Sequence, residues 1–128
     1  MSLANATAVA TLTASDVDRA KAFWTEKLGL TVDPEQGDPG GVLLNAGSGT
    51  KVFIYNSGEP KATNTVVSFK VDDVLATVNE LKGKGVQFES YDMPEIKTDE
   101  NNIATWEDKY HAAWFKDSEG NIICVGNM

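Results

Sequence analysis

A β-hairpin is encoded near the end of the chain, where two apolar runs flank a short polar segment. The sequence there reads Ala112-Ala113-Trp114-Phe115-Lys116-Asp117-Ser118-Glu119-Gly120-Asn121-Ile122-Ile123-Cys124-Val125. Aromatic and β-branched residues in both runs favour strands. The polar centre suits a tight reversal, because glycine adopts positive φ without strain and Asp or Asn can bond its own backbone. We therefore predict an antiparallel pair that closes a sheet, with Cys124 on the returning strand as a candidate functional position.

The composition predicts one domain of ordinary hydrophobicity and no nucleic-acid or membrane partner. The chain has 128 residues, of which 41% are hydrophobic, and a net charge of −8. That length suffices for one core, and the negative charge disfavours nucleic acids and anionic membranes. No apolar run approaches the length of a membrane span, no signal peptide is visible at the start, and a single cysteine cannot form an internal disulfide. We expect a cytoplasmic protein in which residues 1–128 form a single domain.

The same order of elements is predicted twice along the chain. In the first half, the strand Thr7–Ala14 precedes a helix whose apolar stripe runs from Val17 to Leu28, and Ser15 or Asp16 is its N-cap. Three strands follow, at Leu30–Val32, Val42–Leu44 and Val52–Tyr55. In the second half, a strand, a helix capped by Asp72 or Asp73, and three further strands are predicted at Thr65–Val71, Val74–Leu81, Val86–Phe88 and in the final hairpin.

The two halves also align residue by residue. Val9–Val17 matches Val66–Val74, and Gly49–Phe53 matches Gly120–Cys124. Such self-similarity fixes an architecture, here two β-α-β-β-β modules of the α+β class. We place the first module at about residues 7–56, a linker at 57–64 and the second module at about 65–126.

Alternation along the first strand of each module predicts which face binds a ligand. In the second module Val67, Phe69 and Val71 form an apolar face for a helix to cover, while the opposite face carries Val66, Ser68 and Lys70. A mixed polar and apolar sheet face is typical of a ligand-binding surface. Simple exposure to solvent is the alternative.

These features together resemble the vicinal oxygen chelate superfamily of glyoxalases, bleomycin-resistance proteins and extradiol dioxygenases. The paired modules, the helix with Phe23-Trp24 and Leu28-Gly29, and the segment Phe115–Ile123 carry the resemblance. The small glyoxalase-like branch is the most similar. The resemblance implies curved mixed sheets that form a cup, helices on the outer face, and a homodimer.

The resemblance also implies a divalent metal in the cup, held by His, Gln or Glu on the first and last strands of each module. The corresponding positions in this chain are Val9, Phe53, Val66 and Cys124. Valine and phenylalanine offer no lone pair, and one thiol cannot hold a metal alone. We therefore expect no metal and no other cofactor.

Three side chains are candidates for catalysis without a metal. If the final hairpin pairs tightly around Ser118-Glu119, His111, Phe115 and Cys124 share one face, and a Cys–His pair would make an activated thiol. The alternative is a buried, inert Cys124 beside an exposed His111. Lys70 is the third candidate, because with Ser68 and Thr11 it would offer a carboxylate or phenolate one cation and two hydroxyls. A solvated surface lysine is the alternative.

A long irregular stretch, Ser90–Trp106, precedes the hairpin and brings further aromatic residues. Loops of this length in a small domain often act as lids. Alternatively, the stretch is simply pinned to the core. The candidate ligand-binding residues are Thr11, Phe53, Ser68, Lys70, Tyr91, Met93, Trp106, Phe115 and Cys124.

Three classes of function follow from these residues. The first is a metal-free cup that binds a small hydrophobic or aromatic organic molecule. The alternative is an enzyme, either a glyoxalase-type lyase with a relocated metal or a metal-free catalyst that uses Cys124, His111 or Lys70. The third is a structural or regulatory partner protein with an empty cup.

Overall fold

Two modules of the predicted element order make up the fold in the computed structural model, which describes residues 3–35, 40–60 and 63–127. Residues 36–39, and residues 61–62 of the predicted linker, lie outside the described residues. The first module comprises η1 (Leu3–Asn5), β1 (Val9–Ala14), α1 (Val17–Ala22), the π-helical turn η2 (Phe23–Lys27), β2 (Thr31–Val32), β3 (Gly41–Asn45), η3 (Gly47–Gly49) and β4 (Lys51–Asn56). The second comprises β5 (Thr65–Lys70), α2 (Val74–Gly83), β6 (Ala104–Trp106), β7 (Tyr110–Lys116) and β8 (Ile122–Gly126). The predicted α+β class is confirmed.

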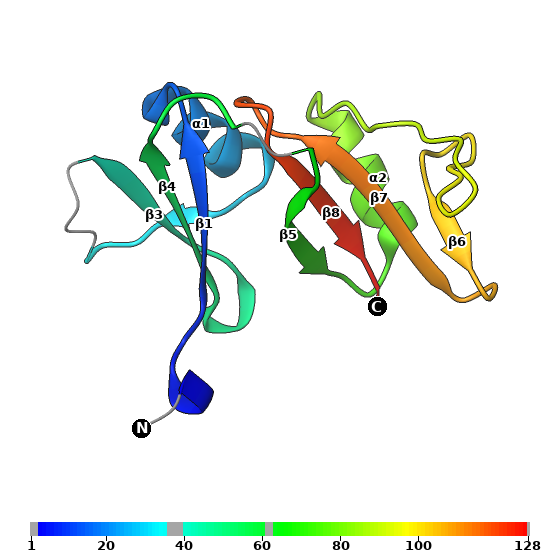
Figure 1. Cartoon of the computed structure of the whole chain (residues 1–128), viewed down its shortest axis with the longest axis horizontal. Coiled ribbons are helices and arrows are strands. Elements are labelled where there is room, and N and C mark those ends of the chain that lie inside the picture. Colours follow the sequence, from blue (N-terminus) through cyan, green and yellow to red (C-terminus); the bar gives the residue numbers. More distant parts are fainter. Residues whose placement is uncertain (1–2, 36–39, 61–62, 128) are drawn as a thin grey trace.

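Each module forms one four-stranded mixed sheet, and the two sheets have the same topology. The strand orders are β1-β4-β3-β2 and β5-β8-β7-β6. The first and last strands of each module are parallel, and the other neighbours are antiparallel. The sheets lie side by side, with β1 next to β5 (Figure 1).

The internal repeat is confirmed at the level of strand register. Thr11 pairs with Phe53 in the first module, and the equivalent Ser68 pairs with Cys124 in the second. The aspartate N-caps are equivalent too, since Asp16 accepts from the Arg19 amide and Asp73 from the Ala76 amide, both at 3.0 Å. The alignment of Phe53 with Cys124 is therefore correct.

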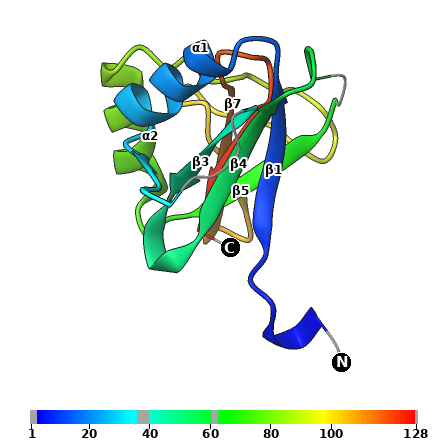
Figure 2. The same ribbon diagram turned by 90° about the vertical axis from the view of Figure 1, so that its left-hand side faces the viewer.

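Both helices cover the same side of the sheets, and the main core lies beneath them (Figure 2). Trp24 and Val78 from the helices are fully buried against inward-facing strand residues such as Leu44, Ile54 and Ile123. This single cluster takes residues from both modules. Among the described residues, no helix has both the length and the apolar character needed to cross a membrane.

The turn between β7 and β8 joins the modules through polar contacts. The Glu119 carboxylate accepts from the Ser15 and Asp16 amides at 3.1 Å and from Arg19 Nε at 2.6 Å, at the start of α1. Asp117 accepts from Trp24 Nε1 at 3.0 Å, and Asn121 Nδ2 donates to the Thr13 carbonyl at 3.1 Å. Every residue of this turn that is buried and polar is therefore satisfied by the first module or by the turn itself.

The predicted second strand of module two, at Val86–Phe88, is wrong. Val86 is buried in the core, and Phe88 makes only an isolated bridge to Phe115. The chain then leaves the sheet as a loop, residues 89–103, and returns as β6 inside the stretch predicted to be irregular. The apolar residues Val86 and Phe88 correctly indicated contact with the core. One isolated bridge does not make a strand.

Candidate functional site

The sheet faces that point away from the helices form the candidate site, which we call the open face. In the first module it carries the side chains that alternate with the buried ones, namely Val9, Thr11, Thr13, Leu43, Asn45, Lys51, Phe53 and Tyr55. In the second module it carries Ser68, Lys70, Ala112, Trp114, Ile122 and Cys124. Because β1 lies next to β5, the two halves of the open face adjoin.

Two stacked rings dominate the open face of the first module. Phe53 and Tyr55 lie on β4 with ring centroids 6.1 Å apart and an angle of 8° between the planes. Gly41 on β3 makes room for them, since a β-carbon there would lie 2.6 Å from Phe53 Cζ. Phe53 is half-buried and Tyr55 is 36% exposed, so one aromatic surface remains available.

A lysine that sequence reasoning missed lies next to these rings. Lys51 Nζ donates to the Asp33 carboxylate and, at 2.7 Å, to Asn45 Oδ1. The hydrogen bond from Lys51, assisted by one from the Glu35 amide, lowers the pKa of the Asp33 carboxyl. An ammonium group has three protons, so one remains for a ligand. The signal in the sequence was Asp33 directly after a predicted strand, two strands away from Lys51.

A second aromatic group covers the open face of the other module. We define the aromatic cluster as Tyr91, Trp106 and Trp114, packed around Ala104, Ala112 and Cys124. Tyr91 and Trp106 both meet Trp114 edge to face, with centroids 5.5 and 6.3 Å away. Two of the predicted ligand-binding residues, Tyr91 and Trp106, are thus brought together around a third ring that the prediction did not include.

The loop of residues 89–103 is ordered by its own hydrogen bonds and lies against the open face through the packing of Tyr91 and Ile96 and a 2.8 Å bond from the Glu89 amide to the Trp114 carbonyl. The Thr98 amide donates to the Tyr91 carbonyl at 2.9 Å, and the Tyr91 amide donates to the Thr98 hydroxyl at 2.9 Å. Asp99 Oδ1 accepts from the Ile103 amide at 3.0 Å. Ile96 packs on the aromatic cluster, whereas Met93 is 47% exposed. Of the two alternatives for this stretch, the contacts favour a segment pinned to the sheet.

Ser68, Lys70 and Cys124 form the polar side of the second half. Burial raises the pKa of the Cys124 thiol, and a hydrogen bond with Ser68 opposes that rise only in part. Cys124 is 8% exposed, so the thiol is protonated and shielded. Ser68 and Lys70 are exposed at the edge of the sheet.

The predicted grouping of His111, Phe115 and Cys124 on one face is wrong. The hairpin pairs Trp114 with Cys124 and Phe115 with Ile123, which is one residue away from the assumed register. Such a slip moves a side chain to the other face. Phe115 therefore lies in the core under the helices, 1% exposed, and His111 bonds Thr105 at 2.9 Å on the same side. An activated Cys–His pair is excluded by this placement.

The residues at the family's metal positions do not fit a metal. Val9 and Phe53 lie on the open face, Val66 lies at a bulge of β5, and Cys124 lies beneath the aromatic cluster. Three of the four side chains have no donor atom, and the fourth is a shielded thiol. Within residues 3–35, 40–60 and 63–127, no three His, Cys, Asp or Glu side chains are grouped to hold a metal ion.

Comparisons with known proteins identify the family. The profile of the Glyoxalase/Bleomycin resistance protein/Dioxygenase superfamily matches residues 6–125. A Bacillus subtilis (strain 168) protein described as "Uncharacterized protein YetH" is 29% identical over an alignment of 117 residues. The alignment covers 86% of this chain and 88% of that protein.

Solved structures of the same fold include proteins of more than one kind. The crystal structure of UcmS2 has a TM-score of 0.72 and 20% identity and covers 95% of this chain and 97% of its own. TnmS3, "an antibiotic binding protein from Streptomyces sp. CB03234", has a TM-score of 0.66 and 21% identity, and the match covers 98% of this chain and 97% of TnmS3. Lactoylglutathione lyase from Agrobacterium tumefaciens has a TM-score of 0.66 and 21% identity, and the match covers 95% of this chain and 92% of the lyase.

Proposed function

The chain belongs to the Glyoxalase/Bleomycin resistance protein/Dioxygenase superfamily, and from this premise we propose that it binds a flat aromatic organic molecule on the open face without a metal. The observation that carries the proposal is the chemistry of the four positions at which the resemblance implies metal ligands. They hold Val9, Phe53, Val66 and Cys124 in place of donor groups. A sheet face that is lined with rings and offers few donor atoms for a Lewis acid is suited to binding.

The polar groups on the open face indicate the substituents that such a ligand would carry. Lys51 and Lys70 are cations at separate positions of the open face, and Thr11 and Ser68 contribute hydroxyls. Cations and hydroxyls beside aromatic rings suit a ring system that carries phenolate, quinone or carboxylate oxygens. The name of TnmS3 describes antibiotic binding by a protein of this fold, which is consistent with a ligand of this kind.

The experiment is a calorimetric and thermal-shift titration with two probes, 2-hydroxy-1,4-naphthoquinone and 1,8-dihydroxyanthraquinone. We expect a rise in Tm with either probe, because a ligand that binds only the native state stabilises it. Phe53→Leu removes a ring from the open face and should weaken binding about fivefold, since a ring contact contributes about 1 kcal/mol. The matched control is Phe23→Leu, which removes a half-buried ring on the helix side and should leave the affinity unchanged.

Two results would count against the proposal. Absence of stabilisation by both probes would remove its main support, and equal weakening by Phe53→Leu and Phe23→Leu would move the binding site away from the open face.

A further inference from the structure

An apolar cavity lies on the opposite side of the sheets from the open face. It has a volume of about 190 Å³ and lies between the two modules, beside α2. Its apolar walls are Leu28, Leu30, Phe69, Val71, Phe115 and Val125. Phe69 projects here from β5, whereas its neighbours Ser68 and Lys70 project to the open face. The cavity is therefore separate from the site of the proposed function.

The size and walls of the cavity suit a small hydrocarbon group better than water. A volume of about 190 Å³ corresponds to roughly six water molecules at ~30 Å³ each, and each water needs two to four polar partners. The Thr77 hydroxyl at the wall already donates to the Asp73 carbonyl at 2.9 Å. An apolar cavity of ~150 Å³ accommodates one benzene ring. A ring with a short chain therefore matches this space.

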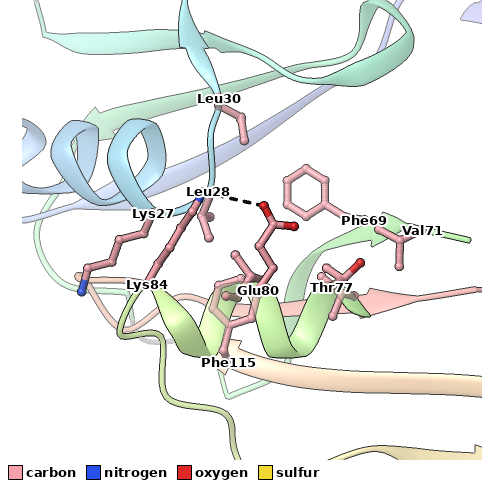
Figure 3. Close-up of a pocket in the computed structure, with 11 residues that line it drawn as sticks. Lys27, Leu28, Leu30, Phe69, Val71, Thr77, Glu80, Lys84 and Phe115 are labelled. Carbon is pink, nitrogen blue, oxygen red and sulfur yellow. Dashed lines mark ion pairs between the residues drawn. The ribbon is translucent and has the colours of Figure 1, made fainter. Parts of the chain in front are cut away.

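Two lysines from different modules lie together at the mouth of the cavity. Lys27 Nζ lies 3.5 Å from the point that a β-carbon on Gly85 would occupy. Gly85 directly follows Lys84 in the chain. Figure 3 shows Lys27 and Lys84 at one end of the cavity, opposite Phe69 and Val71, with the Lys27 side chain extending outward and the Lys84 ammonium turned toward Glu80. The lysines make the mouth cationic in a chain whose net charge is −8.

The ion pairing at the mouth leaves positive charge available. Glu80 pairs with Lys84 at 3.9 Å, and both side chains are exposed, at 71% and 42%. In the described part of the chain, no carboxylate lies within 4.0 Å of Lys27, whose ammonium instead lies 5.6 Å from the centre of the Phe23 ring. The three charged groups at the mouth sum to one net positive charge.

We propose that this cavity binds a small amphipathic carboxylate, with its hydrocarbon end against Phe69 and Phe115 and its carboxylate beside Lys27. The apolar walls recognise the hydrocarbon, and the lysine recognises the anion. Since the walls come from both modules, the bound molecule bridges them. Open-face binding and cavity binding are independent, so failure of one leaves the other standing.

The test compares 3-phenylpropionate with its neutral analogue 3-phenylpropan-1-ol by calorimetry at low ionic strength. We expect the carboxylate to bind about tenfold more tightly than the alcohol, because only the carboxylate pairs with Lys27. Lys27→Gln should reduce this preference to about twofold or less, while leaving the affinity for the alcohol unchanged. Lys21→Gln is the matched control, since Lys21 is an exposed lysine on α1 that does not line the cavity, and it should change neither affinity.

A second variant and an NMR map of the probe complete the test. Glu80→Gln removes the competing carboxylate and should tighten binding of 3-phenylpropionate. Amide shifts should concentrate at Leu28, Leu81 and Val125. The proposal is overturned if neither probe binds, if both bind equally, if Lys27→Gln and Lys21→Gln act alike, or if the shifts fall on the open face.

Discussion

At the scale of single residues, the most constrained side chain is the Glu119 carboxylate. It is fully enclosed and receives hydrogen bonds from two amides and from Arg19, whose own side chain is 54% exposed. Hydrogen bonding to Arg19 is the largest influence and lowers the pKa of Glu119 to about 2, although burial opposes it. Part of the attachment of this turn to the first module therefore depends on the ionisation of Glu119, beside the contacts of Asp117 and Asn121.

We predict that Glu119 makes the stability of the protein dependent on pH in the acid range. Because the pKa is lower in the folded chain, the stabilisation is present above the ordinary value of 4.5 and is lost as the pH falls toward about 2. Glu119→Gln should lower the free energy of unfolding at pH 7 by roughly 2 kcal/mol, allowing for solvent screening at Arg19. Urea unfolding of both proteins between pH 7 and pH 2 measures this, and the difference should vanish at the acid end.

The matched control for this change is Glu100→Gln, at an exposed glutamate. It should follow the wild type at every pH. Parallel curves for wild type and Glu119→Gln from pH 5 to pH 2 would contradict the assignment.

We predict that Cys124 reacts slowly with thiol reagents in the native protein. Burial raises the pKa of the thiol, and only 8% of the residue is exposed. Labelling with 5,5′-dithiobis(2-nitrobenzoate) at pH 8 should be about a hundredfold slower than in urea-unfolded chain, because both thiolate formation and access require opening. Equal rates in the two states would mean that the aromatic cluster does not shield the thiol.

At the scale of elements, the turn between β6 and β7 carries backbone strain. Glu107 and Asp108 have φ values of 55° and 56°, and the Lys109 amide donates to the Trp106 carbonyl at 3.1 Å. Hairpin turns with two positive φ values favour Asn-Gly, because other side chains crowd the backbone there. The acidic pair therefore occupies a turn to which it is poorly suited.

We predict that Glu107→Asn combined with Asp108→Gly raises the free energy of unfolding by about 1 kcal/mol, since it relieves this strain. Thermal and urea unfolding measure the gain. Glu107→Gln with Asp108→Ala removes the same charges while retaining both β-carbons, so it should bring no gain. An equal gain in both double variants would assign the effect to charge.

At the scale of the whole molecule, the open face is wide and carries exposed apolar side chains. Val9 and Tyr55 are 40% and 36% exposed there, and Val66, at the adjoining bulge of β5, is 37% exposed. We expect a second copy of the chain to cover them, because the family resemblance implies a homodimer.

We predict a dimer in sedimentation experiments, and a shift toward monomer with Val9→Glu, because the charge would be buried in the interface. Leu75→Glu is the matched control. Leu75 is 46% exposed on α2, on the other side of the molecule, and its replacement should leave the mass unchanged. A wild type that stays monomeric at the highest concentration that can be reached would contradict the prediction.

The sequence by itself determined the modules, the aspartate caps and the equivalence of Phe53 with Cys124, because local capping chemistry and strand alternation are written in neighbouring residues. It also placed Thr11, Ser68 and Lys70 on the open face. Only the tertiary structure decided the hairpin register, which moved Phe115 and His111 to the helix side.

The tertiary structure alone also brought together residues far apart in the chain. Glu119 meets Arg19 across 100 positions, Lys51 meets Asp33, and the helix-side cavity combines Lys27 with Lys84. Such contacts depend on how two sheets and two helices pack, and no local pattern encodes that packing. The strand predicted at Val86–Phe88 is only an isolated bridge at Phe88 for the same reason, because strand pairing depends on the packing of the whole sheet.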